Sequence, residues 1–183
     1  MRFQTTTLAG VWLVNLDRHM DERGYLMRTW CAEEFGARGL NTVWPQCNET
    51  MTARCGSVRG MHWQQHPHGE VKLVRCARGR VYDVVADVRP ESPTFGQWEA
   101  FELSSTNLRQ IYIPVGFAHG FQTLEDDTVL HYQMGEAYQP GLSAGFRWDD
   151  PAVGITWPQS VTSLSRRDAG LPSLAEATVT APS

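Results

Sequence analysis

Pro114-Val115-Gly116-Phe117-Ala118-His119-Gly120-Phe121 is the stretch of this sequence that decides the fold, because it turns the chain between two short strand-like runs at 109–113 and 119–124. Similar runs, broken by Gly and Pro, lie at 71–76, 80–89, 97–103 and 128–134. A spacing of about ten residues between short strands is typical of a β-sandwich or barrel. The sequence therefore predicts an all-β domain, with one short helix at 31–38, where acidic residues come early and Gly39 follows.

Composition limits the class of protein. The chain has 183 residues, 42% of them hydrophobic, and a formal net charge of −4. This length suits a single domain over 1–183, and the charge argues against nucleic acid as a partner. Apolar runs of about 18 residues and an N-terminal apolar leader are both lacking, so we expect no membrane association. We expect the last ten or so residues to be poorly ordered.

The cysteines indicate a reducing compartment. The chain contains Cys31, Cys47, Cys55 and Cys76, and none of them forms a Cys-x-x-Cys pair. A chain of this length does not need a disulfide framework to fold. We therefore expect free thiols and a cytoplasmic protein.

Alternation along the strands predicts which side chains share a face. In 80–89, Tyr82, Val84, Ala86 and Val88 make one apolar face, and Val81, Asp83, Val85 and Asp87 make the other. Lys72 shares a face with Val74 and Cys76, and Tyr132 shares one with Leu130 and Met134, while His131 points the other way. A lysine among apolar neighbours is unusual and needs an explanation.

The turn at 114–121 resembles the second sequence motif of cupins, in which a histidine points into the barrel. The first cupin motif needs two histidines one residue apart and then a glutamate. His66 and His68 have that spacing, but Glu70 comes too early and Lys72 stands where the glutamate could fall. A lysine repels a divalent cation and suits an anion or a carbonyl. We expect a barrel with no metal and no cofactor. A metal cupin that uses His62, His66, His68 and His119 remains the alternative enzyme.

A series of motifs carries a more specific resemblance. Gly56-Ser57-Val58-Arg59-Gly60-Met61-His62-Trp63 is similar to a segment of the dTDP-4-dehydrorhamnose 3,5-epimerase family. Further blocks match in order at 21–24, 72–75, 92–96, 112–114, 116–121, 147–151 and 157–158. The likeness runs from about residue 8 to about residue 170. It implies a cupin-type double-stranded β-helix, a jelly-roll barrel, with short peripheral helices.

The resemblance implies an isomerase that inverts carbons beside the 4-keto group of a nucleotide-linked 6-deoxy sugar. Such a proton is acidic only if the enolate is stabilised, so the site needs a base, an acid on the opposite face and a cation at the carbonyl oxygen. By the family pattern, His62 is the base and Asp168 orients it. Tyr132 is the acid, and Lys72 stabilises the enolate.

The same resemblance implies residues that bind the substrate. They are Arg23, Gln46, Asn48, Arg59, Lys72, His119, Tyr138, Arg28 and Arg167. Arginine suits a diphosphate because its planar fork donates two hydrogen bonds at once. The N-terminal strand that carries Arg23 crosses to the partner subunit in the family, so a homodimer with strand exchange is implied.

Three positions depart from the family pattern at the nucleotide end. Arg28 and Ser143 stand where the family usually or often has glutamate, and Leu26 replaces a common phenylalanine. We hypothesise that the chemistry is retained and the nucleotide end is altered, which leaves dTDP, CDP, GDP and UDP open. Inversion at C3, at C5 or at both also stays open. A non-catalytic sugar-nucleotide binding protein on the same barrel is the alternative outside enzymes.

Overall fold

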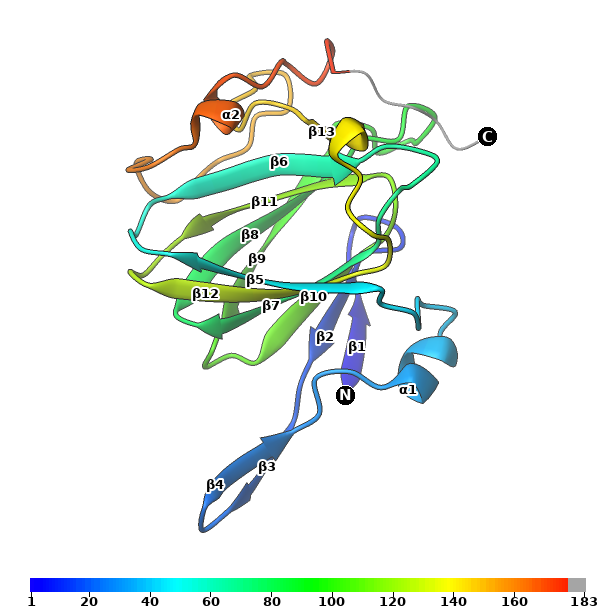
Figure 1. Ribbon diagram of the computed structural model, residues 1–183, viewed down its shortest axis with the longest axis vertical. Helices are drawn as coiled ribbons and strands as arrows, with labels where there is room; N and C mark the ends of the chain where they lie inside the picture. The colour runs from blue at the N-terminus through cyan, green and yellow to red at the C-terminus, as the bar shows by residue number, and fades with distance from the viewer. Residues whose placement is uncertain (178–183) are drawn as a thin grey trace.

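The structure is a computed structural model that describes residues 1–177, and Figure 1 shows two antiparallel sheets facing each other. The six-stranded sheet has the order β1-β2-β10-β7-β12-β5, and the five-stranded sheet has the order β13-β6-β11-β8-β9. The strands of the first are β1 (Arg2–Thr5), β2 (Trp12–Asn15), β10 (Arg109–Ile113), β7 (Lys72–Arg78), β12 (Thr128–Met134) and β5 (Gln46–Thr52). Those of the second are β13 (Ser143–Gly145), β6 (Val58–Gln64), β11 (Phe117–Thr123), β8 (Arg80–Asp87) and β9 (Trp98–Ser104).

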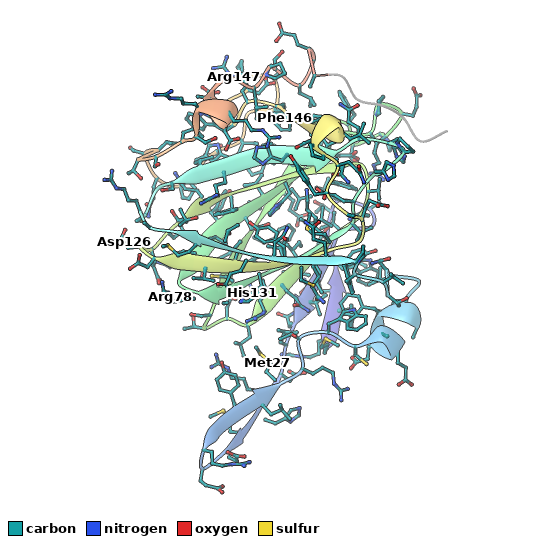
Figure 2. The ribbon with its side chains drawn as sticks, viewed as in Figure 1. Met27, Arg78, Asp126, His131, Phe146 and Arg147 are labelled. Carbon is teal, nitrogen blue, oxygen red and sulfur yellow. The ribbon has the colours of Figure 1, made fainter. Side chains whose placement is uncertain are left out.

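The main hydrophobic core lies between the two sheets. It joins Val74, Cys76 and Leu130 of the six-stranded sheet to Val85 and Phe121 of the five-stranded sheet, and side chains project into this space in Figure 2. Face-to-face packing of two sheets through their inward residues is how sandwiches and jelly rolls bury apolar area. The all-β prediction is confirmed.

The outer face of the five-stranded sheet is also buried. Val84, Ala86 and Val88 pack there against Phe146 and Val153 of the C-terminal segment, which lies over this sheet in the figures. The two predicted faces of 80–89 are therefore both correct, but the wholly apolar one faces the C-terminal segment. The other face, with Asp83, points into the barrel. A strand covered on both sides loses the simple polar and apolar alternation.

A third cluster covers the outer face of the six-stranded sheet. Phe35 of helix α1 (Ala32–Gly36) packs with Val14, Leu73 and Tyr112. The prediction of a helix at 31–38 is confirmed, although the helix is shorter. A hairpin of β3 (Arg18–Asp21) and β4 (Gly24–Met27) projects away from both sheets. The short elements η1 (Pro140–Leu142) and α2 (Arg166–Ala169) lie in the C-terminal third.

Two smaller predictions have mixed outcomes. Within the expected disordered tail, Leu174 is buried in the second cluster, so the described residues 174–177 do not follow the prediction, and the remainder lies outside the described residues. The four cysteines are free, as predicted, with Cys76 buried and Cys47 exposed. Across residues 1–177, no helix has the length and apolar character needed to span a bilayer.

Candidate active site

A cavity of about 1040 Å³ opens between the two sheets. Strands β5, β7 and β12 form one wall, β6 and β11 form the other, and the segments around residues 138–143 and 163–168 complete the lining. The cavity brings together most of the residues that the sequence predicts for the site: His62, Lys72, Tyr132, Asp168, Gln46, Asn48, Arg59, His119, Tyr138 and Arg167.

His62 and Asp168 form a hydrogen-bonded pair. His62 Nε2 lies 2.7 Å from Asp168 Oδ1. Asp168 is buried in α2, which begins where Ser165 Oγ accepts from the Asp168 backbone N–H at 3.0 Å. Burial acts to raise the pKa of Asp168, but the hydrogen bond and charge of His62, with the Gly60 backbone N–H, hold that pKa below 3.8. An ionised carboxylate here fixes the orientation of the imidazole and stabilises its protonated form.

Lys72 stands at the start of β7 with its side chain buried. Its Nζ lies 2.9 Å from Glu70 Oε1 and donates to the His62 carbonyl oxygen at 3.2 Å. The prediction that Lys72 points inward among apolar residues is confirmed, since its neighbours Val74 and Cys76 belong to the core between the sheets. The ammonium is therefore a fixed positive charge in the cavity wall.

Tyr132 comes from β12 in the opposite sheet from His62. Its ring lies edge-on to His119 with the centroids 6.0 Å apart. Burial is the main cause that raises the pKa of Tyr132 above 10.0, and the negative charge of Asp83 adds to it. The phenol consequently stays protonated near neutral pH and is able to donate a proton.

A second histidine–carboxylate pair lies deeper in the barrel. His119 Nε2 is 2.9 Å from Asp83 Oδ2, and Asp83 is fully buried. Burial raises the pKa of Asp83 against the opposing effects of His119 and Lys72. Sequence reasoning placed Asp83 on the correct face but gave it no role. Asp83 contacts His119 because β8 pairs with β11. Alternation within one strand does not reveal which strand lies beside it.

Positive charge is concentrated on the cavity lining. Arg59 is held by Thr52 Oγ1 at 3.0 Å and by the Met51 carbonyl at 3.3 Å. Arg167 donates to Ser143 Oγ at 2.6 Å, and Arg54, which sequence reasoning missed, also lines the cavity. The acidic residues in the described lining, Glu70 and Asp168, are each paired with a cationic or basic side chain. The lining is suited to an anionic ligand.

Two predicted binding residues lie elsewhere. Arg23, at the hairpin turn, is 82% exposed and pairs with Asp21. Arg28 follows the hairpin and pairs with Glu34 at 3.5 Å. Neither side chain lines the cavity of its own chain. Their predicted contact with a ligand therefore depends on a second subunit.

The geometry does not favour a metal centre. Within residues 1–177, no group of three or more His, Cys, Asp or Glu side chains is arranged to hold a metal ion. His62 and His119 are each bonded to a separate carboxylate, and His66 and His68 do not line the cavity. The metal-cupin alternative lacks the ligand cluster on which it depends.

Comparison with known proteins points to one family. The family model described as dTDP-4-dehydrorhamnose 3,5-epimerase matches residues 5–176. The chain is 43% identical over 177 residues to the dTDP-4-dehydrorhamnose 3,5-epimerase of Sinorhizobium fredii, covering 96% of this chain and 91% of that one. It is 36% identical over 178 residues to the dTDP-4-dehydrorhamnose 3-epimerase of Streptomyces niveus, covering 97% and 86%.

Solved structures agree. The rmlC epimerase of Mycobacterium tuberculosis superposes with a TM-score of 0.92 at 33% identity, covering 96% of this chain and 90% of that one. A 4-keto-6-deoxy sugar epimerase from the novobiocin gene cluster of Streptomyces spheroides superposes with a TM-score of 0.91 at 36% identity, covering 96% and 88%. The predicted cupin-type barrel is therefore confirmed.

Proposed function

We propose that this chain, which belongs to the dTDP-4-dehydrorhamnose 3,5-epimerase family, carries out its epimerisation with His62, Lys72 and Tyr132. The chain is an isomerase that acts on a nucleotide-linked 4-keto-6-deoxyhexose in deoxysugar biosynthesis. One observation carries the assignment of roles: a carboxylate-bound histidine, a buried ammonium and a partly buried phenol line one cavity.

His62 is the base that removes the proton beside the ketone. The Asp168 carboxylate is hydrogen-bonded to His62 Nε2, so Nδ1 is the nitrogen that takes the proton. The carboxylate then stabilises the imidazolium that forms. A general base of this kind contributes about 10²–10⁴-fold to the rate.

Lys72 stabilises the enolate. When the proton leaves, negative charge develops on the C4 oxygen, and a fixed ammonium placed beside that oxygen stabilises it. The ammonium already donates a hydrogen bond to the His62 carbonyl oxygen in the cavity wall, so little reorganisation accompanies the reaction.

Tyr132 returns a proton to the other face of the sugar ring. It belongs to β12 and His62 belongs to β6, so the acid and the base come from opposing sheets. Burial keeps the phenol protonated, as the raised pKa indicates. Removal from one face and return to the other inverts the carbon.

Arg59, Arg167 and Arg54 bind the diphosphate, while Gln46 and Asn48 contact the rest of the nucleotide sugar. Related epimerases have been solved with dTDP-4-keto-L-rhamnose, from Legionella pneumophila, and with TDP, from Bacillus anthracis. For this chain dTDP is the first nucleotide to test. Ser143 lines the cavity at a position that is often glutamate in the family pattern, so CDP, GDP and UDP sugars belong in the same panel.

The protein acts as a homodimer in the cytoplasm, with the β3–β4 hairpin of one chain reaching the cavity of the other. The hairpin projects from its own barrel and exposes Met20, Tyr25 and Leu26. Apolar side chains exposed together on a projecting element indicate an interface. Exchange of the hairpin would also bring Arg23 to a partner's ligand. Free cysteines are consistent with a reducing compartment.

Proton NMR in D₂O tests the proposal. With dTDP-4-keto-6-deoxyglucose, the signals at C3, C5 or both should disappear as deuterium replaces the exchanged protons, and the pattern identifies the inverted carbons. If none of the dTDP, CDP, GDP and UDP 4-keto sugars exchanges, the protein is a binding protein and the proposed roles are wrong.

A further inference from the structure

Glu70 lies in the wall of the active-site cavity, although the mechanism above gives it no task. It precedes β7 in a loop, and its side chain is only 10% exposed. Together with Asp168 it supplies the carboxylates of the described lining. The spacing of Glu70 from His66 and His68 does not fit a metal motif, and its partner is a lysine.

That partner is the ammonium that faces the substrate. Glu70 Oε1 lies 2.9 Å from Lys72 Nζ, and the Lys72 side chain is 7% exposed. On another side, Nζ donates to the His62 carbonyl oxygen at 3.2 Å. An ammonium has three N–H groups, so with two of them directed to protein oxygens a third remains for a ligand.

Lysine needs such restraint to act at a fixed point. The strand fixes its backbone, with Lys72 opposite Ile113 of β10 and Met134 of β12, but its four-carbon stem has several rotatable bonds. The hydrogen-bond acceptors around Nζ therefore determine the position of the positive charge. An ammonium that loses one of these acceptors moves toward another acceptor or toward water.

We propose that Glu70 is a positioning residue, which holds the Lys72 ammonium at the point where the carbonyl oxygen of the sugar binds. This inference rests on the proposed function. Glu70 touches neither the substrate nor a transferred proton. It acts through Lys72, because Glu70 Oε1 lies within hydrogen-bond distance of Lys72 Nζ.

The experiment compares Glu70→Ala, Glu70→Gln, Lys72→Ala and the Glu70→Ala/Lys72→Ala double variant of the full chain. Deuterium incorporation and turnover are measured with the 4-keto sugar that the wild-type protein exchanges. Glu49→Ala is the matched control, because Glu49 also pairs with a basic side chain, His131 at 2.9 Å, but outside the cavity. Thermal unfolding of each variant shows that it is folded.

Glu70→Ala should slow incorporation by about 10- to 100-fold, since a misplacement of about 1 Å can cost about 10²-fold. KM should change by less than about 3-fold, because the lost interaction belongs to the transition state. Glu70→Gln keeps an oxygen acceptor at the same reach and should recover most of the rate. The double variant should be no slower than Lys72→Ala alone.

Three results would overturn the inference: a wild-type rate in Glu70→Ala, an effect confined to KM, or additive losses in the double variant. If Glu70→Ala does not fold, Glu70→Asp serves instead. It keeps the charge but is shorter by one methylene, so it should be slow, and a wild-type rate would reject the inference. A failure of the proposed function looks different, because the wild-type protein itself then shows no exchange.

Discussion

Gly60 is where a single methyl group should damage both the fold and the site. A Cβ at this position would lie 2.5 Å from Gly120 Cα and 3.0 Å from the His119 carbonyl oxygen. Ordinary contact begins near 3.4 Å, so β6 and β11 must separate by about 0.9 Å in Gly60→Ala. The backbone there has a φ of +131°, which L-residues with a side chain rarely adopt.

The magnitude follows from these two effects. Overpacking of this kind costs about 1–3 kcal/mol, and a residue held in an unfavourable backbone region costs about 1–3 kcal/mol. A combined loss of about 3 kcal/mol lowers Tm by roughly 6–12 °C in a domain of this size. His62 and His119 face each other across the same pair of strands, and a shift of about 1 Å can reduce the rate by about 10²-fold.

Thermal unfolding and deuterium incorporation below Tm are the assays. Gly24→Ala is the control for backbone strain, because Gly24 has a φ of +133° with nothing within 4 Å of the added Cβ. Gly60→Ala should therefore be clearly less stable than Gly24→Ala. If it matches Gly24→Ala in Tm and exchanges deuterium at the wild-type rate, the close approach of the two strands does not hold His62 in place.

Three further predictions concern the proposed proton transfers. His62→Ala should reduce deuterium incorporation by about 10²–10⁴-fold, and normal turnover would exclude His62 as the base. Tyr132→Phe should spare proton removal at least in part but impair inversion, seen as incorporation without epimerised product; equal loss of both would argue against a separate acid. For Asp168, the folded pKa is lowered, so its stabilising contribution is present above the unfolded pKa of about 3.9 and is lost as pH falls through the folded value. Urea unfolding from pH 7 to pH 2 should show a stability difference between wild type and Asp168→Asn that shrinks below about pH 4, and a difference constant across that range would contradict this.

The strands from β7 to β12 could be predicted because they carry apolar runs and are bounded by turns. Alternation also placed Lys72 and Tyr132 inside the barrel, as the structure confirms. The strands at the N-terminal end were missed, because β1 has only four residues and most of β5, at the edge of its sheet, is exposed. Short or exposed strands carry little apolar alternation.

The site was predictable where the family pattern fixes residue types. The pairs Glu70–Lys72 and Asp83–His119 were not predicted. Each is a contact between side chains, and the alternation of residue types along one strand does not give the distance between two side chains. The short helix that carries Asp168 was not predicted, and its start depends on the Ser165 cap. Arg54 had no distinguishing signal and is identified only by its place in the lining.

The placement of His62 on β6 and Tyr132 on β12 has a consequence for stereochemistry. In the proposed mechanism the proton-transfer group on each face of the sugar ring comes from a different sheet. The distance between the sheets therefore determines what fraction of the removed protons is replaced from the opposite face. Substitutions that widen this gap should uncouple isotope uptake from inversion, whereas substitutions confined to one sheet should reduce both together. The handedness of the product is then a property of the spacing between two layers of backbone.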